Sequence, residues 1–120
     1  SSFSAHLKNV QEILESVNKS SLVLLDELGS GTDPIEGSAF AMAVIDYLRD
    51  RKCKSFITTH YSEVKAHGYN EEGIETASME FDVNTLSPTY RLLIGIPGES
   101  NALTIAKRLG FSSMVRWQGC

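Results

Sequence analysis

The sequence predicts an α/β fold in which parallel strands are connected by crossover helices and are followed by an antiparallel hairpin and a C-terminal helix. Short apolar runs alternate with helical patterns over the first half, which favours a parallel sheet. Two runs of alternating apolar residues then flank a turn, which indicates paired antiparallel strands. The chain has 120 residues, of which 42% are hydrophobic and 22% charged, so it fits one domain or a part of one.

The first half contains the helix and strand patterns from which the parallel sheet is predicted. Residues 3–17 carry apolar side chains at helical spacing. Residues 22–25 are a continuous apolar run, which we expect to be a strand covered on both faces. Residues 35–51 combine a broad apolar face with strong helix formers. We expect a second strand over residues 54–59, and then one or two helical turns over residues 62–66.

The second half is expected to form the hairpin and the last helix. Apolar and polar residues alternate over residues 77–83 and again over residues 90–94. Such alternation predicts strands that are half-buried, with their apolar side chains toward a core. Ser100 is placed to cap a helix over residues 102–109, and Gly110 is placed to end it.

Composition argues against several classes of protein. No apolar run approaches the roughly 20 residues of a transmembrane helix. The net charge of −4 lacks the basic excess of a self-sufficient DNA-binding domain. Two cysteines without metal-ligand spacing or a disulfide framework favour a reducing, cytoplasmic setting. The chain opens with Ser1 and not with Met, so we expect it to be part of a longer protein.

Two acidic residues directly after the first strand form the strongest functional pattern. Ligands of open α/β sheets bind beyond the carboxyl ends of strands, where Asp26 and Glu27 lie. Adjacent side chains of a strand point in opposite directions, so the two acids can do different work. Asp26 can hold Mg²⁺ through water, and Glu27 can orient and deprotonate an attacking water. The simpler alternative is that the strand ends there and polar residues begin.

His60 follows the second strand in the same way. Neighbouring parallel strands would bring Asp26, Glu27 and His60 to one edge, where a histidine can donate a hydrogen bond to a γ-phosphate oxygen. The alternative is a surface histidine without such a function. Residues 1–4 open the first helix with serine hydroxyls, which form either an anion site or an ordinary cap. Residues 29–32 lack a following lysine and indicate a shaped loop, not a phosphate cradle.

Three motifs in this order resemble the ATPase domain of the MutS family, whose members are ABC-type ATPases. They are SSFSAHL at residues 1–7, LVLLDELGSGTDP at residues 22–34 and TTHY at residues 58–61. The GTDP variant and TYRL at residues 89–92 look most like the second bacterial MutS family. The resemblance implies a partial P-loop NTPase fold. Residues 1–120 would be the C-terminal part of that domain, with the signature, Walker B, D-loop and switch histidine present and the Walker A loop missing.

The resemblance also implies a role for each matched residue. Asp26 matches the Walker B aspartate that holds Mg²⁺, and Glu27 matches the glutamate that activates water. His60 matches the switch histidine, and Ser1 matches the signature serine that reaches the γ-phosphate of the partner subunit. The loop that crosses the dimer interface in this family corresponds to Gly31, Thr32 and Asp33.

For the parent protein, the resemblance implies a homodimer that binds and hydrolyses ATP with Mg²⁺ and couples this to DNA binding in mismatch repair or recombination. Members of the second family usually end in a nuclease-like domain. The nucleic acid stays open between branched or mismatched DNA and an RNA assembly such as the ribosome. Two other interpretations stay open: a non-catalytic dimerisation or interaction module, and an unrelated Mg²⁺-dependent phosphohydrolase that uses Asp26 and Glu27.

The phosphate-binding loop Gly-x-x-x-x-Gly-Lys-Ser/Thr does not occur in the 120 residues. That loop supplies most of the backbone N–H groups that hold the phosphates of a nucleotide. We therefore expect this chain alone to bind ATP weakly and to hydrolyse it negligibly. The strand before that loop would neighbour residues 22–25, so we also expect an open sheet edge, and a chain that either self-associates through this edge or is marginally stable.

Overall fold

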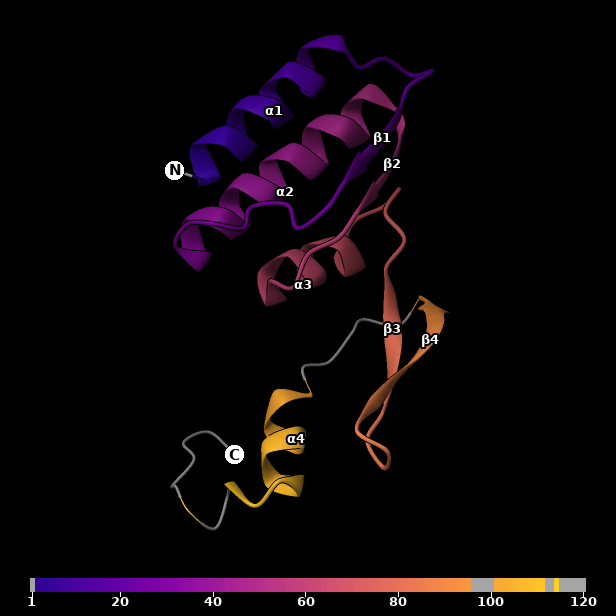
Figure 1. The fold of residues 1–120 in the computed structure, drawn as a ribbon. Coiled ribbons are helices and arrows are strands. Elements are labelled where there is room, and N and C mark those ends of the chain that lie inside the picture. Colours follow the sequence, from indigo (N-terminus) through magenta and orange to yellow (C-terminus); the bar gives the residue numbers. More distant parts are fainter. Residues whose placement is uncertain (1, 96–100, 112–113, 115–120) are drawn as a thin grey trace. The chain divides into compact units, whose positions relative to one another are not determined.

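The computed structural model describes residues 2–95, 101–111 and 114 of the chain, which forms two compact units with their boundary between Ile74 and Glu75. The predicted α/β class is confirmed, with one parallel and one antiparallel pair of strands. The elements, shown in Figure 1, are α1 (Ser2–Ser16), β1 (Leu22–Leu25), α2 (Pro34–Arg51), β2 (Lys54–Ile57), α3 (Ser62–Asn70), β3 (Ala77–Asp82), β4 (Ser87–Ile94) and α4 (Ala102–Arg108).

In the first unit, β1 and β2 are parallel neighbours connected by α2. Leu22 lies opposite Lys54, and Leu25 lies opposite Ile57. Because parallel strands run in the same direction, the carboxyl ends of both strands lie at the same end of the pair. The segments that begin at residues 26 and 58 therefore start side by side.

The ends of α2 follow from its sequence. Asp33 caps its N-terminus, since one carboxylate oxygen accepts a hydrogen bond from the backbone N–H of Glu36 at 3.2 Å. Pro34 is the first helical residue, a position that suits proline because proline lacks the N–H that has no partner there. Lys52 ends the helix in a left-handed conformation, with φ of 60°.

One face of β1 and the three helices of this unit build its core. Figure 1 shows α1 and α2 side by side, and the rings of Phe3 and Phe40 meet edge to face at 5.8 Å between them. Burial of each large apolar side chain is worth roughly 1.5–3 kcal/mol, so this cluster is the main stabilising element. The buried apolar residues are Val10, Val23, Leu25, Leu28, Ala41, Val44, Leu48, Tyr61 and Val64.

The opposite face of β1 and β2 is exposed. Leu22 and Leu24 are 63% and 67% exposed, and Phe56 is 68% exposed. The prediction that the first strand is covered on both faces is therefore wrong for the described residues. The helices pack against the side of β1 that carries Val23 and Leu25, and alternate side chains of a strand point away from that side. We call Leu22, Leu24 and Phe56 the apolar sheet face.

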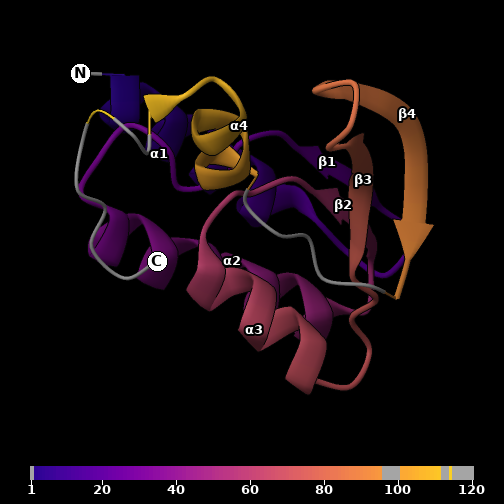
Figure 2. The same cartoon turned by 90° about the horizontal axis from the view of Figure 1, so that it is seen from below.

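In the second unit, β3 and β4 form the predicted antiparallel hairpin, which Figure 2 shows as a curved ribbon. Asp82 lies opposite Ser87 next to the turn, and the register shifts between Met79 and Phe81. The expected burial is wrong for most of the alternating apolar residues, because Met79, Tyr90, Leu92 and Ile94 are exposed. Phe81 alone of the apolar residues named here is half-buried, as expected.

The helix α4 follows the hairpin. Gly110 comes after its end with φ of 88°, a left-handed conformation that glycine adopts without strain, as predicted for this position. The predicted cap Ser100 lies outside the described residues. In the described part of the chain, no helix combines the length and the apolarity that spanning a membrane requires.

Candidate functional site

The ends of β1 and β2 are joined through Thr58. Its hydroxyl donates a hydrogen bond of 2.5 Å to Oδ1 of Asp26 and accepts one of 2.8 Å from the backbone N–H of Glu27. Its backbone continues the strand pairing, because its N–H donates to Leu25 O and its carbonyl accepts from Leu28 N. A single threonine thus fixes the carboxylate of Asp26 and the backbone of Glu27 at the carboxyl ends of β1 and β2.

Glu27 lies outside the strand. β1 ends at Leu25, and Glu27 has φ of 51°, an uncommon conformation for a residue with a side chain. The alternation of a strand therefore does not decide where the side chain of Glu27 points. The expectation that Asp26 and Glu27 point in opposite directions does not follow from strand geometry here. Such a conformation costs about 1–3 kcal/mol and persists where surrounding contacts impose it, often at functional sites. The carboxylate of Glu27 is exposed and has no hydrogen bond or ion pair with the described residues.

His60 lies two residues after Thr58, on the segment that leaves β2 at the same edge. It is exposed, and the centre of its ring lies 4.6 Å from that of Tyr61. Tyr61 is buried, and its hydroxyl donates a hydrogen bond of 2.8 Å to the carbonyl of Gly29. The exposed imidazole of His60 therefore lies next to Tyr61, whose buried side chain is held in place by this hydrogen bond.

The loop between β1 and α2 lies against the beginning of α1. Gly31 has φ of 97°, and a side chain there would come within 3.1 Å of the hydroxyl oxygen of Ser2 and 3.4 Å of the backbone nitrogen of Phe3. The predicted signature residue Ser1 lies outside the described residues, but its neighbour Ser2 is thus next to this loop. The segments predicted to contact phosphate and to cross a dimer interface meet within one chain.

Two other residues of this loop contact α2. The hydroxyl of Thr32 donates to a carboxylate oxygen of Glu36 at 3.5 Å, and Asp33 caps the helix. Both side chains therefore shape the loop within the chain. Their role at a dimer interface stays a prediction.

The residues at the carboxyl ends of β1 and β2 offer a magnesium ion few protein ligands. In the described part of the chain, no group of three or more histidine, cysteine or acidic side chains could hold a metal ion. Asp26 offers a carboxylate held by Thr58, with one oxygen that makes no hydrogen bond to the described residues. Mg²⁺ keeps several waters and binds through one or two carboxylates plus substrate phosphates. The Asp26 carboxylate therefore has the chemistry of a single protein ligand for such an ion.

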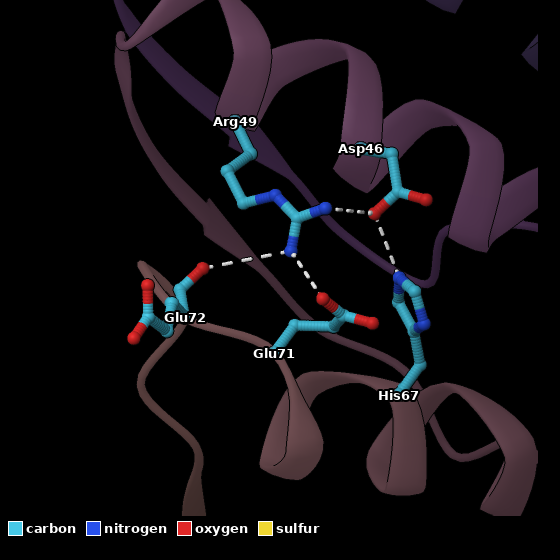
Figure 3. Close-up of polar contacts among 5 residues, drawn as sticks. All are labelled: Asp46, Arg49, His67, Glu71 and Glu72. Carbon is cyan, nitrogen blue, oxygen red and sulfur yellow. Dashed lines mark hydrogen bonds and ion pairs between the residues drawn. The ribbon is translucent and has the colours of Figure 1, made fainter.

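The helix that follows His60 is held on α2 by the polar contacts shown in Figure 3. The Arg49 guanidinium lies 3.3 Å from Asp46 Oδ1 and 3.1 Å from Glu71 Oε2, and it also donates to the carbonyl of Glu72. Asp46 Oδ1 lies 2.7 Å from Nε2 of His67 on α3 as well. Residues from both ends of α3 are thus attached to the core: Tyr61 before it, and His67 and Glu71 near its end.

Sequence reasoning missed Thr58 and Tyr61 as parts of this site. In the sequence they are only the neighbours of His60. Thr58 could have been found from register, because it is the first residue after β2 and so lies opposite Asp26. The contact between Tyr61 and Gly29 joins residues 32 positions apart, and no local pattern indicates it.

Comparison with known proteins gives the family. Residues 1–117 match the family model MutS domain V. The chain is 82% identical over 115 residues to an Endonuclease MutS2 of Fusobacterium nucleatum subsp. nucleatum, which covers 96% of this chain and 15% of that protein. It is 58% identical to one of Caldanaerobacter subterraneus subsp. tengcongensis with the same coverage. It is also 58% identical over 112 residues to one of Staphylococcus haemolyticus, covering 93% of this chain and 14% of that protein.

The chain therefore spans about 15% of the length of the first relatives. The resemblance of its three motifs to the MutS family is confirmed, since the family model covers nearly the whole sequence and includes all three. On this match, the chain belongs to the MutS domain V family.

Proposed function

We propose that this chain is the C-terminal part of the ATPase domain of a MutS-type, DNA-associated ATPase, with a P-loop NTPase fold in the complete domain. The parent protein would bind and hydrolyse ATP with Mg²⁺ at a site completed by a second subunit. The observation that carries the proposal is the bridge made by Thr58. It ties Asp26 and Glu27 to the segment that bears His60, as a site at the carboxyl ends of two parallel strands requires.

Each side chain has a chemical task in this proposal. Asp26 would hold Mg²⁺, which supplies positive charge to the phosphates when it is bound. Glu27 would take a proton from the attacking water, and its exposed, unpaired carboxylate is available for this. His60 would donate a hydrogen bond to a γ-phosphate oxygen. The chain's residues would thus bind the metal and activate the water, while the loop that binds the phosphates would belong to another part of the domain.

The proposed dimer involves the loop between β1 and α2. Gly31 lies against Ser2 at the start of α1, so one subunit would present the Gly31–Asp33 loop together with the start of α1. We propose that both face the nucleotide of the partner subunit. A site of this kind hydrolyses ATP only when two subunits meet, which makes the ATPase sensitive to anything that separates them.

The test uses a full-length chimera in which the 115 matched residues of this chain replace those of the Fusobacterium nucleatum relative. Glu27→Gln should keep ATP binding and lower turnover by roughly 10²–10⁴-fold, the usual contribution of a catalytic base. Glu12→Gln, at an exposed position of α1, is the matched control and should leave turnover unchanged. Unchanged turnover in Glu27→Gln would remove Glu27 from this role.

DNA binding is the second part of the proposal. The net charge of −4 makes this chain a poor surface for DNA, so the parent's DNA contacts would lie in other parts. Any DNA cleavage implied by the relatives' name, Endonuclease MutS2, would also belong there. The affinity of the chimera for branched and mismatched DNA should change between its ATP-bound and nucleotide-free forms. A structured RNA serves as the competitor, and preferential RNA binding would redirect the proposal.

The 120 residues alone should not be an ATPase. They lack the phosphate-binding loop, so the backbone donors that hold the β- and γ-phosphates are missing. Titration of the isolated chain with ATP and Mg²⁺ is expected to give no saturable binding. Saturable binding together with turnover would contradict this expectation.

A further inference from the structure

We infer that Tyr61 is a positioning residue that couples the His60 segment to the loop between β1 and α2. This inference rests on the proposed function and names a control element within the same site. It starts from a hydrogen bond in the interior: Tyr61 is only 7% exposed, and its hydroxyl donates to the carbonyl of Gly29 at 2.8 Å. No other described residue donates a hydrogen bond to that carbonyl.

Two glycines make room for this contact. A side chain on Gly29 would come within 2.4 Å of the carbonyl oxygen of Gly37, and one on Gly37 would come within 2.7 Å of the Tyr61 hydroxyl oxygen. For each glycine the nearest atom is the backbone carbonyl oxygen of the other, which does not move aside as the end of a flexible side chain does, and the remaining close atoms include those of the Tyr61 ring. The loop, the first turn of α2 and the phenol ring therefore pack as one unit.

The hydroxyl is what links the two segments. A phenylalanine ring would fill the same volume but would leave the Gly29 carbonyl without its donor. An unpaired buried carbonyl is destabilising, so the hydrogen bond favours the loop position in which the Gly29 carbonyl is paired. Because Tyr61 directly follows His60, a backbone movement at His60 would pull on this hydrogen bond. The bond would thereby transmit the state of His60 to the loop that begins at Gly29, and through it to Gly31 beside Ser2.

The test compares Tyr61→Phe with Tyr69→Phe in the full-length chimera. Tyr69 lies on α3 and is 62% exposed, so its hydroxyl serves as the matched control. Tyr61→Phe should lower kcat roughly 3–10-fold while KM for ATP changes less than about twofold, since the bond positions the site without binding substrate. In a His60→Ala background, Tyr61→Phe should have no further effect on kcat, because it acts through His60. Tyr69→Phe should leave kcat and KM unchanged.

A second measurement does not depend on turnover. Amide hydrogen exchange of residues 29–33 should become faster in Tyr61→Phe and stay unchanged in Tyr69→Phe. Unchanged exchange and unchanged kcat in Tyr61→Phe would overturn the inference, as would a loss of kcat that is equally large with and without His60. If the unsubstituted chimera hydrolyses no ATP, the proposed function fails. In that case, faster exchange in Tyr61→Phe would show only that the hydrogen bond holds the loop in place. The coupling of Tyr61 to catalysis would fail together with the proposed function.

Discussion

The hydroxyl of Thr58 donates a hydrogen bond to the carboxylate of Asp26 across the ends of β1 and β2. Both side chains are exposed, so the bond contributes less to stability than a buried one would. Its main effect is geometric. It holds one carboxylate oxygen toward the neighbouring strand and leaves the other free of partners among the described residues.

Thr58→Val should disturb the site more than the fold. Valine keeps the branched shape but removes both hydrogen bonds, one to Asp26 and one from the Glu27 N–H. The free energy of unfolding of the chain should fall by about 1 kcal/mol, measured by urea denaturation. ATP turnover in the full-length chimera should fall roughly tenfold. Thr58→Ser, which keeps the hydroxyl, should recover most of that turnover.

The control for this prediction is Thr104→Val, an exposed position on α4. It applies the same chemical change to a threonine whose hydroxyl makes no hydrogen bond to the described residues. It should leave turnover unchanged. If Thr58→Val retained full turnover, or if Thr58→Ser were as inactive as Thr58→Val, the bridge would not position the acids.

Local patterns predicted the elements well because helix and strand signals are short-range. The helical spacing over residues 3–17, the helix over residues 35–51 and the position of Gly110 all agree with the structure. The helix expected over residues 62–66 is longer and runs to Asn70. Its last turns are held by contacts with Arg49 and Asp46 of α2, which a local pattern does not contain.

Burial was predicted less well than the elements, for a physical reason. A strand with apolar side chains on both sides, such as Leu22–Leu25, has the same sequence whether one or two layers cover it. Likewise, alternation over β3 and β4 shows which residues share a side but not whether anything packs there. The part of the site that sequence reasoning placed best is the pair Asp26 and Glu27, since strand ends are local. The Thr58 bridge depends on register between strands, which is not local.

Arg49→Met should destabilise the first unit. Arg49 joins Asp46 of its own helix to Glu71 and to the carbonyl of Glu72 after α3. Methionine keeps much of the aliphatic stem but removes the charge and its donors. Individual surface ion pairs contribute about 0–1 kcal/mol, and a network of this kind lies at the upper end. We expect the free energy of unfolding to fall by about 1 kcal/mol, and by less in concentrated salt, because salt screens the pairs.

Arg91→Met is the control for Arg49→Met. Arg91 makes one looser ion pair, 3.8 Å from a carboxylate oxygen of Glu80, with its side chain 72% exposed. Urea denaturation at low and high salt should show little change for Arg91→Met in either condition. Equal losses for the two variants, or a loss at Arg49 that is independent of salt, would argue against an ion-pair network.

The turn between β3 and β4 should weaken in acid through Asp82. The backbone N–H groups of Asn84 and Thr85 donate to Oδ1 of Asp82 at 2.8 and 3.3 Å, and these bonds lower the pKa of that carboxyl below its usual 3.8. The Thr85 hydroxyl and the Arg108 charge act in the same direction. Because the folded-state pKa is the lower one, the stabilisation is complete above the unfolded value and is lost as pH falls through the folded value.

Carboxyl NMR titration of the chain should therefore show Asp82 losing its proton at lower pH than an unperturbed aspartate does. Asp82→Asn should remove this pH dependence of the turn while keeping an oxygen that accepts both backbone bonds. A carboxyl that titrates at or above its usual value would contradict the hydrogen-bond geometry of the turn.

The isolated chain should self-associate through the apolar sheet face. Leu24 and Phe56 lie opposite each other on β1 and β2 and are both about two-thirds exposed. Exposed apolar side chains on a two-stranded sheet with open edges favour contact with a second copy. Light scattering should therefore detect dimers or larger species. The double variant Leu24→Lys/Phe56→Lys should be monomeric, because each copy then carries two like charges on that face. Tyr69→Lys, which changes an exposed aromatic residue on α3, should associate as the unsubstituted chain does. A monomeric unsubstituted chain, or association that survives the double variant, would show that this face is not where copies meet.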